Sequence, residues 1–411
     1  MNGDRSPRCF MKKLAIKSVS HAARWARNLT CRVSWCLNGR PGSAELGFSN
    51  SAYASGLYSD AADWLQVALD KFPHDYSLQL RMSRWARYGI VPFEHAKEML
   101  LKIVDNAPPN LARNASIDLL NLCWERAGAA AAVVHLPGTM PWLGSKPAMK
   151  LRLAALMHDA GLAEEALELL AEVANEHPRS LRNMGYLELT LAAQKAGFNH
   201  LAQARKAAAV AQRLDAGTAR LQSLLDTRDV AVVANGRSLK GRSLGSKIDA
   251  HRNVMRFNNY ATGDVIDLGQ RTDIWVRPPF PQYVPWRKFR KQPLLLFTGP
   301  NLRHRFSDAV QLLAACPEEY GDIAVVPSSL YAKLFKELEA SPSSGILGLA
   351  LLAEHWGNRV PQTRVFGYSL EDNRENMSIY HHGSVQGDRP SRHNWKAELR
   401  LFQNLVETEQ Q

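Results

Sequence analysis

Two patterns of apolar and polar positions divide the chain. Up to about Leu214 the apolar residues recur at helical spacing, and from Asp215 onward short apolar runs alternate with helical segments. The runs predicted to be strands are Val230–Ala234, Asn253–Phe257, Thr272–Val276, Leu294–Phe297, Ile323–Val326 and Arg364–Phe366. Helices are predicted between them, for example at Leu330–Leu338 and Ile346–His355. This alternation predicts an α/β domain with a mostly parallel sheet, preceded by an all-α region.

The all-α region repeats itself. Pro73, Pro108 and Pro178 follow similar runs of small and apolar residues at spacings of about 35 and about 70 residues, and a degenerate copy falls between the last two. The pattern resembles the tetratricopeptide repeat (TPR), in which paired helices stack and leave a concave face for a protein partner. An ordinary helical bundle with coincidental spacing is the alternative.

Charge and cysteine usage narrow the class of protein. The net charge of +12 and the pI near 9.5 indicate an anionic partner, but no zinc-finger spacing or RNA-recognition signature supports nucleic acid. Five scattered cysteines without a Cys-x-x-Cys pair favour a reducing compartment. Residues 11–35 mix basic residues with leucines and two tryptophans, which predicts peripheral contact with an anionic membrane. A basic leader that packs on its own domain or stays disordered is the alternative.

The stretch Val230–Thr272 holds the first candidate site. Its apolar run stops at Asn235-Gly236, and further glycines and basic residues follow in the same loop. Glycines let backbone N–H groups approach oxygens closely, and the basic side chains Arg237, Lys240, Arg242 and Lys247 favour negative charge. We interpret this as a phosphate-binding turn. A plain strand with a solvated basic loop is the alternative, and the glycine spacing does not fit the dinucleotide pattern.

A second candidate site is Ser343-Ser344-Gly345, which opens an apolar helix. Hydroxyl groups, unpaired N–H groups and the positive end of the helix dipole make such a start a phosphate site. The same residues are also a common helix cap, which is the alternative. Three histidines, His381, His382 and His393, follow within thirteen residues of each other.

Four stretches resemble, in order, the motifs of the animal-type sialyltransferase superfamily, glycosyltransferase family 29. They are Val230–Asn259 for the large motif, Pro342–Tyr368 for the small motif, Tyr380-His381-His382 for the third motif, and His393 with Glu398 for the very short motif. The resemblance covers roughly residues 228 to 405. It implies a variant GT-A, Rossmann-like fold and an inverting transfer from a CMP-activated acidic sugar that requires no metal.

The resemblance also implies residue roles. The donor would be bound by Asn235, Gly236, Ser238, Asn258, Ser343, Ser344 and Gly345. His393 is expected to take the proton of the acceptor hydroxyl, for which an imidazole with a pKa of about 6.5 is suited. His381 or His382 is expected to assist the departing CMP phosphate. Glu398 is expected to orient the site, with a solvated helix carboxylate as the alternative.

The chain lacks cysteines that the family motifs carry, and this affects the cellular location that we expect. Val230 stands where animal members carry a cysteine, and the small-motif stretch has none, so we expect packing alone to hold the site. Asp264 and Asp267 are predicted to belong to a loop and not to a metal site. We expect a bacterial, cytoplasmic enzyme at the inner face of the cytoplasmic membrane. The predicted parts are a leader over 1–45, a TPR-like domain over 46–215, a linker over 216–228 and a catalytic domain over 229–411.

The motifs identify neither the donor sugar nor the acceptor. The donor is sialic acid or Kdo, because both are CMP-activated 2-keto acids, and loops such as Arg277–Arg290 are expected to distinguish them. The expected acceptor is a cell-surface glycan or glycolipid such as lipopolysaccharide or capsule. The alternative function is a catalytically inactive TPR-containing interaction protein in envelope polysaccharide assembly.

Overall fold

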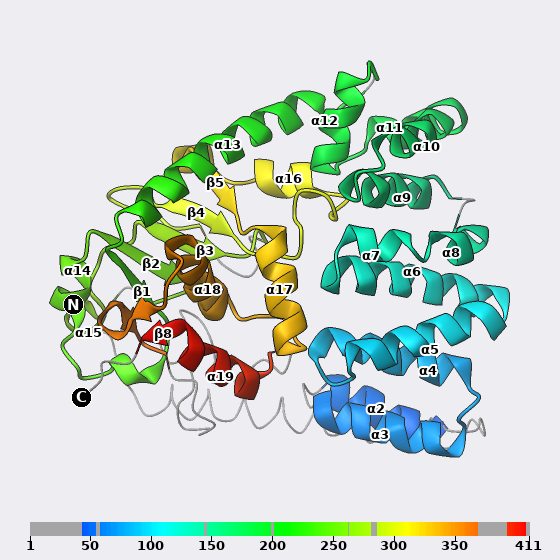
Figure 1. Cartoon of the computed structure of the whole chain (residues 1–411), viewed down its shortest axis with the longest axis horizontal. Helices are drawn as coiled ribbons and strands as arrows, with labels where there is room; N and C mark the ends of the chain where they lie inside the picture. The colour runs from blue at the N-terminus through cyan, green and yellow to red at the C-terminus, as the bar shows by residue number, and fades with distance from the viewer. Residues whose placement is uncertain are drawn as a thin grey trace, which may run out of the picture.

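The computed structural model describes residues 43–54, 58–143, 146–198, 201–261, 263–280, 286–368 and 393–407. An all-α array stands beside an α/β part (Figure 1). The predicted membrane segment 11–35 and the third-motif residues Tyr380, His381 and His382 lie outside the described ranges. Within those ranges no helix is both long and apolar enough to cross a membrane.

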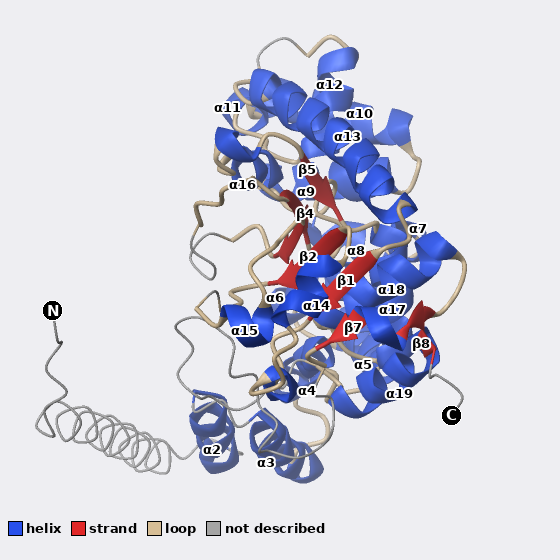
Figure 2. Ribbon diagram, turned by 90° about the vertical axis from the view of Figure 1, so that its left-hand side faces the viewer, coloured by secondary structure: helices blue, strands red, loops and turns tan. Residues whose placement is uncertain are grey.

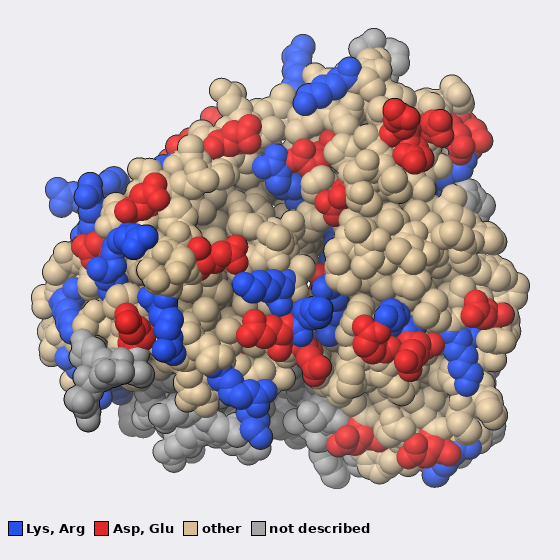
Figure 3. Space-filling model, viewed as in Figure 1, with Lys and Arg blue, Asp and Glu red and all other residues tan. Residues whose placement is uncertain are grey.

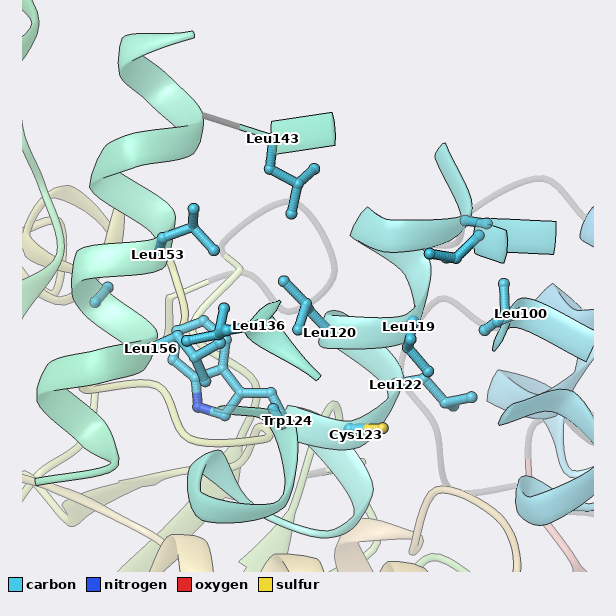
Figure 4. Close-up of a cluster of buried hydrophobic side chains, with 14 of the residues drawn as sticks. Leu100, Leu119, Leu120, Leu122, Cys123, Trp124, Leu136, Leu143, Leu153 and Leu156 are labelled. Atoms are coloured by element: carbon cyan, nitrogen blue, oxygen red, sulfur yellow. The ribbon is translucent and has the colours of Figure 1, made fainter. Parts of the chain in front are cut away.

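The array is built of helices that pack on their neighbours in the chain, such as α2 on α3, α5 on α6 and α9 on α10. The helices are α2 (Ser43–Ala54), α3 (Tyr58–Lys71), α4 (Tyr76–Arg84), α5 (Phe93–Asn106), α6 (Pro109–Arg126), α7 (Ala129–Val133), α8 (Leu136–Leu143), α9 (Pro147–Asp159), α10 (Ala163–Glu176), α11 (Pro178–Arg182) and α12 (Leu187–Lys195), with the 3-10 helix η1 (Trp85–Tyr88) after α4. Figure 4 shows part of their shared core, where Leu120 and Trp124 of α6 meet Leu153 and Leu156 of α9. The predicted degenerate copy falls on the short helices α7 and α8. The region is helical as predicted, while its assignment as a TPR stays a prediction.

The α/β part contains a parallel sheet of six strands in the order β5-β4-β3-β2-β1-β7. The strands are β1 (Val230–Val233), β2 (Asn253–Phe257), β3 (Ile274–Arg277), β4 (Leu294–Phe297), β5 (Ile323–Val325) and β7 (Val365–Phe366). Each coincides with a predicted strand to within two residues at either end, which confirms the mostly parallel sheet. A separate pair, β6 (Val360–Pro361) with β8 (Val406–Glu407), was not predicted from the apolar pattern.

Helices cover both faces of this sheet (Figure 2). Alternate strand residues face opposite sides: Val230 and Val232 share a core with α17 (Ser328–Leu338), α18 (Ser344–Trp356) and α19 (Trp395–Leu405). Ala231 and Val233 pack with α14 (Gly245–Ala250) and α15 (Val265–Leu268) on the other face, which α16 (Ala309–Ala314) extends. Short 3-10 helices lie at η2 (Arg237–Leu239), η3 (Glu318–Tyr320) and η4 (Gln362–Arg364).

The predicted linker over 216–228 is wrong, because most of it belongs to the long helix α13 (Ala204–Asp226). This helix crosses the edge strand β5: its Ala207, Val210 and Leu214 enter one core of the sheet, and Leu221 and Leu225 enter the other. The crossing occurs at Gly217, where a Cβ atom would lie 1.9 Å from the carbonyl oxygen of Ile323. The helix therefore covers the edge of the sheet and does not merely connect two domains.

Candidate active site

The strand order reverses at β1, which has β2 on one side and β7 on the other. In open parallel sheets, ligands bind beyond the carboxyl ends of the strands at such a reversal. The loops that leave β1, β2 and β7 there carry Asn235, Asn258 and Gly367. Two contacts join these loops: the Asn235 side-chain amide donates to the Phe257 carbonyl at 3.0 Å, and the Gly236 N–H donates to the Gly367 carbonyl at 2.8 Å.

Asn258 links the end of β2 to α18. Its backbone is left-handed, with φ of 51°, a conformation that asparagine tolerates better than most residues. Its N–H donates to the Val276 carbonyl at 2.7 Å, and its carbonyl accepts from the Trp275 indole at 2.8 Å. With its backbone fixed in this way, its side-chain oxygen accepts a hydrogen bond from the Ser344 hydroxyl at 3.3 Å.

The N-terminus of α18 is the predicted phosphate site. Ser343 is the N-cap, and its hydroxyl accepts from the Ile346 N–H at 3.3 Å, so the predicted cap is present. A cap does not exclude an anion site, because the first N–H groups of a helix have no partner within it and the helix dipole is positive at this end. The Gly345 carbonyl accepts from the Tyr368 hydroxyl at 2.8 Å, which fixes the first turn. Sequence reasoning assigned no role to Tyr368.

Glu398 on α19 is fully buried, with 0% of its surface exposed, so the solvated alternative for this residue is wrong. Its two carboxylate oxygens accept from the Ser343 N–H and the Ser343 hydroxyl, both at 2.7 Å. Burial raises the pKa of this carboxyl to about 7, against the lowering effect of the two hydrogen bonds from Ser343. Glu398 therefore ties α19 to the start of α18.

His393 lies just before α19 and beside this pair. Its Nδ1 is 2.7 Å from the Ser341 carbonyl oxygen and 3.9 Å from a Glu398 oxygen, and its ring contacts Trp395. Because a carbonyl oxygen only accepts, Nδ1 carries the hydrogen, which leaves the lone pair of the neutral ring on Nε2. This is the tautomer that a general base requires.

The structure thus gathers Asn258, Ser343, Ser344, Gly345, His393 and Glu398 around the start of α18, with Asn235 and Gly236 joined through the neighbouring loops. Ser238 lies exposed on η2, and its predicted role in donor binding stays a prediction. His381 and His382 fall within 369–392, which the structure does not describe, so their role stays a prediction.

The structure also shows the contacts of Arg277, at the start of the loop predicted to distinguish the donors, and of the pair Asp264 and Asp267. Arg277 ends β3 fully buried, with its guanidinium 3.9 Å from the Trp286 ring centroid, and burial lowers its pKa to about 10. Asp264 is the N-cap of α15, and Asp267 accepts from the backbone N–H groups of Gly241 and Ser243. Among the described residues, no group of three or more His, Cys, Asp or Glu could hold a metal ion.

Comparison with known proteins agrees with the predicted resemblance. The profile of glycosyltransferase family 29 (sialyltransferase) matches residues 184–292, which include α13, β1 to β3 and the loops of Asn235 and Asn258. No curated protein matches the chain. Two crystal structures of a mammalian sialyltransferase, one in complex with Gal-beta-1-3GalNAc-ortho-nitrophenol, are similar over 43% of this chain with 19% identity and a TM-score of 0.33. The chain spans 65% and 64% of their lengths.

The match to the family 29 profile confirms the predicted resemblance. The match begins at Met184, well before the predicted start near 228, and ends before the segments that carry Ser343 and His393. The earlier start fits the structure, since α13 forms part of the core of the sheet.

Proposed function

We propose that the chain is a glycosyltransferase that moves an acidic 2-keto sugar from a CMP-activated donor to a glycan hydroxyl. The observation that carries this proposal is the meeting of three features at one place: the Asn258 loop, the N-terminus of α18, and His393, whose Nδ1 donates to the Ser341 carbonyl. They meet where the strand order of the sheet reverses. The family 29 match over the first of these features supports the same reading.

The chemistry follows from the arrangement. The donor phosphate would lie against the N–H groups of Ser344 and Gly345, where the helix dipole favours the charge that grows on CMP as it leaves. His393 Nε2 would take the proton of the acceptor hydroxyl as its oxygen forms a bond to C2 of the sugar. The bond from C2 to the phosphate oxygen breaks on the opposite side, and the anomeric centre is inverted. His381 or His382 would assist the leaving phosphate.

The donor that the family description favours is CMP-sialic acid. CMP-Kdo is the second donor to test, because it presents the same CMP, carboxylate and anomeric C2, and it agrees with the expected bacterial, cytoplasmic setting. The proposed acceptor is a cell-surface glycan or glycolipid such as lipopolysaccharide or capsule, with no metal required. The TPR-like helical array is the proposed binding surface for a protein partner.

Release of CMP from each donor tests the proposal, with an acceptor mixture present and with a chelator added. We expect wild type to release CMP from at least one donor in the presence of the chelator. His393→Ala should lose roughly 100- to 10,000-fold in transfer while it keeps the fold. If neither donor is cleaved and CMP does not bind, the inactive interaction protein becomes the better account. If His393→Ala transfers at the wild-type rate, the assigned base is wrong.

A further inference from the structure

Two apolar side chains stand exposed side by side on the short helix α15. Ile266 has 72% of its surface exposed and Val265 has 45%. Three basic side chains are exposed nearby: Lys240 and Arg242 in the loop before α14, and Lys247 on α14 itself. Lys and Arg gather along the edge of the molecule where α14 lies (Figures 1 and 3).

The basic loop and the apolar helix form one rigid unit. The Asp267 carboxylate, which directly follows Ile266, accepts hydrogen bonds from the backbone N–H groups of Gly241 and Ser243. The first residue of α14, Gly245, packs so closely on α15 that a Cβ atom there would lie 2.0 Å from the Val265 carbonyl oxygen. The exposed basic and apolar side chains are therefore held beside one another by the backbone.

Charge is segregated within this unit. Its three carboxylates accept hydrogen bonds from nearby backbone N–H groups: Asp264 from Asp267, Asp267 from the loop, and Asp249 from Gln270 and Arg271. These backbone hydrogen bonds lower the pKa of Asp267, so this carboxylate stays ionised while it remains bound to the loop. The exposed charges of the loop are basic.

We propose that this surface, formed by Lys240, Arg242, Lys247, Val265 and Ile266, docks on an anionic membrane. Basic side chains around an exposed apolar tip match the two layers of a bilayer surface, the charged headgroups and the start of the acyl chains. The two loops that carry Asn235 and Asn258 continue directly into this surface. Docking there would bring the proposed donor site close to lipid-linked glycans. The proposal does not depend on the enzymatic activity.

Sedimentation of the full chain with vesicles tests it. We expect binding to vesicles that contain phosphatidylglycerol, little binding to phosphatidylcholine alone, and weaker binding as salt is raised. Lys240→Ala with Arg242→Ala should weaken binding by about 25-fold, since each basic residue near an anionic surface contributes about fivefold. Ile266→Ser should weaken it by roughly tenfold through lost apolar burial.

Matched controls separate this surface from the general effect of removing one exposed charge or one exposed apolar side chain. Val134→Ser removes a valine that is 73% exposed on the helical array, and Lys102→Ala removes an exposed lysine of α5. Both should leave vesicle binding unchanged. If the α14–α15 variants bind like wild type, the proposal is wrong and any binding comes from elsewhere. It is also wrong if Ile266→Ser has no effect and soluble polyphosphate binds as well as the vesicles do.

Discussion

At the scale of single residues, the site depends on a buried carboxylate that holds a helix start. Glu398 accepts both the N–H and the hydroxyl of Ser343, and it lies 3.9 Å from the His393 ring. A buried carboxyl resists ionisation, and for this reason its pKa is raised to about 7. The start of the helix that presents the proposed phosphate site is therefore held by Glu398, a carboxyl group whose pKa is near neutral.

The pKa of Glu398 predicts how stability changes with pH. An unfolded glutamate ionises near its ordinary value of 4.5, whereas the folded one stays protonated up to about 7. Between these values the folded state holds one more proton, so its stability falls as pH rises, by about 3 kcal/mol in total. Glu398→Gln should remove this slope because its amide carries no titrating proton.

Urea unfolding of wild type and Glu398→Gln between pH 4.5 and pH 7.5 measures how the free energy of unfolding of each protein changes with pH. The matched control is Glu337→Gln, which replaces an exposed glutamate of α17 and should follow wild type at every pH. Parallel curves for wild type and Glu398→Gln would contradict the assigned burial effect.

At the scale of elements, α18 matters because its packing on the sheet places its N-terminus beside the Asn258 loop. Gly348 lies where the helix crosses β2, and a Cβ atom there would lie 2.5 Å from the Phe257 ring and 2.9 Å from the Met255 sulfur. These distances are too short for real contacts. Gly348 therefore lets the N-terminus of α18 reach the Asn258 loop.

Gly348→Ala should destabilise the fold by roughly 1–3 kcal/mol through overpacking, although alanine favours helices over glycine. It should also weaken CMP binding by moving Ser344 away from Asn258. Gly138→Ala in α8 is the control, because a Cβ atom there meets nothing within 4 Å. Thermal unfolding of both variants shows whether the overpacking at position 348 outweighs the higher helix propensity of alanine. A Gly348→Ala protein as stable as wild type would show that α18 adjusts freely.

The sequence predicts the helices and strands of this domain better than it predicts the contacts between them. The buried strands and the cap at Ser343 follow from local signals, namely apolar runs and a serine before an apolar helix. The course of α13 does not, because Gly217 reads as an ordinary helix breaker until the carbonyl of Ile323 is placed against it. The burial of Glu398 is hidden for the same reason: its partner Ser343 is 55 residues away in the sequence.

At the scale of the whole molecule, polar contacts join the helical array to the α/β part. The Asp159 carboxylate at the end of α9 accepts from the Trp124 indole at 2.6 Å and from the Asn301 amide at 2.5 Å. Arg126 of α6 stacks over the Phe335 ring of α17, with 4.1 Å between its guanidinium carbon and the ring centroid. The array is therefore fastened to the domain that carries the proposed site.

Asp159→Ala should weaken this junction, because it leaves the Asn301 donor of the α/β part without its acceptor. It should also cost roughly 1–3 kcal/mol within the array, where the buried Trp124 indole loses the same acceptor. We expect the array and the α/β part to unfold closer to independently, which calorimetry would record as a broadened or split transition. Asp63→Ala, at an exposed position of α3, should leave the transition as in wild type. An unchanged transition in Asp159→Ala would mean that the junction does not couple the two parts.

The start of α18 and the Asn258 loop together form the proposed CMP site. Calorimetric titration of CMP into the full chain tests it most directly, with Asn258→Ala and Ser344→Ala as the variants and Ser223→Ala, at an exposed position of α13, as the control. The structure predicts saturable binding of one CMP per chain, weakened about tenfold or more by either of the first two substitutions. Absence of CMP binding to wild type, or binding that both substitutions leave unchanged, would contradict the account.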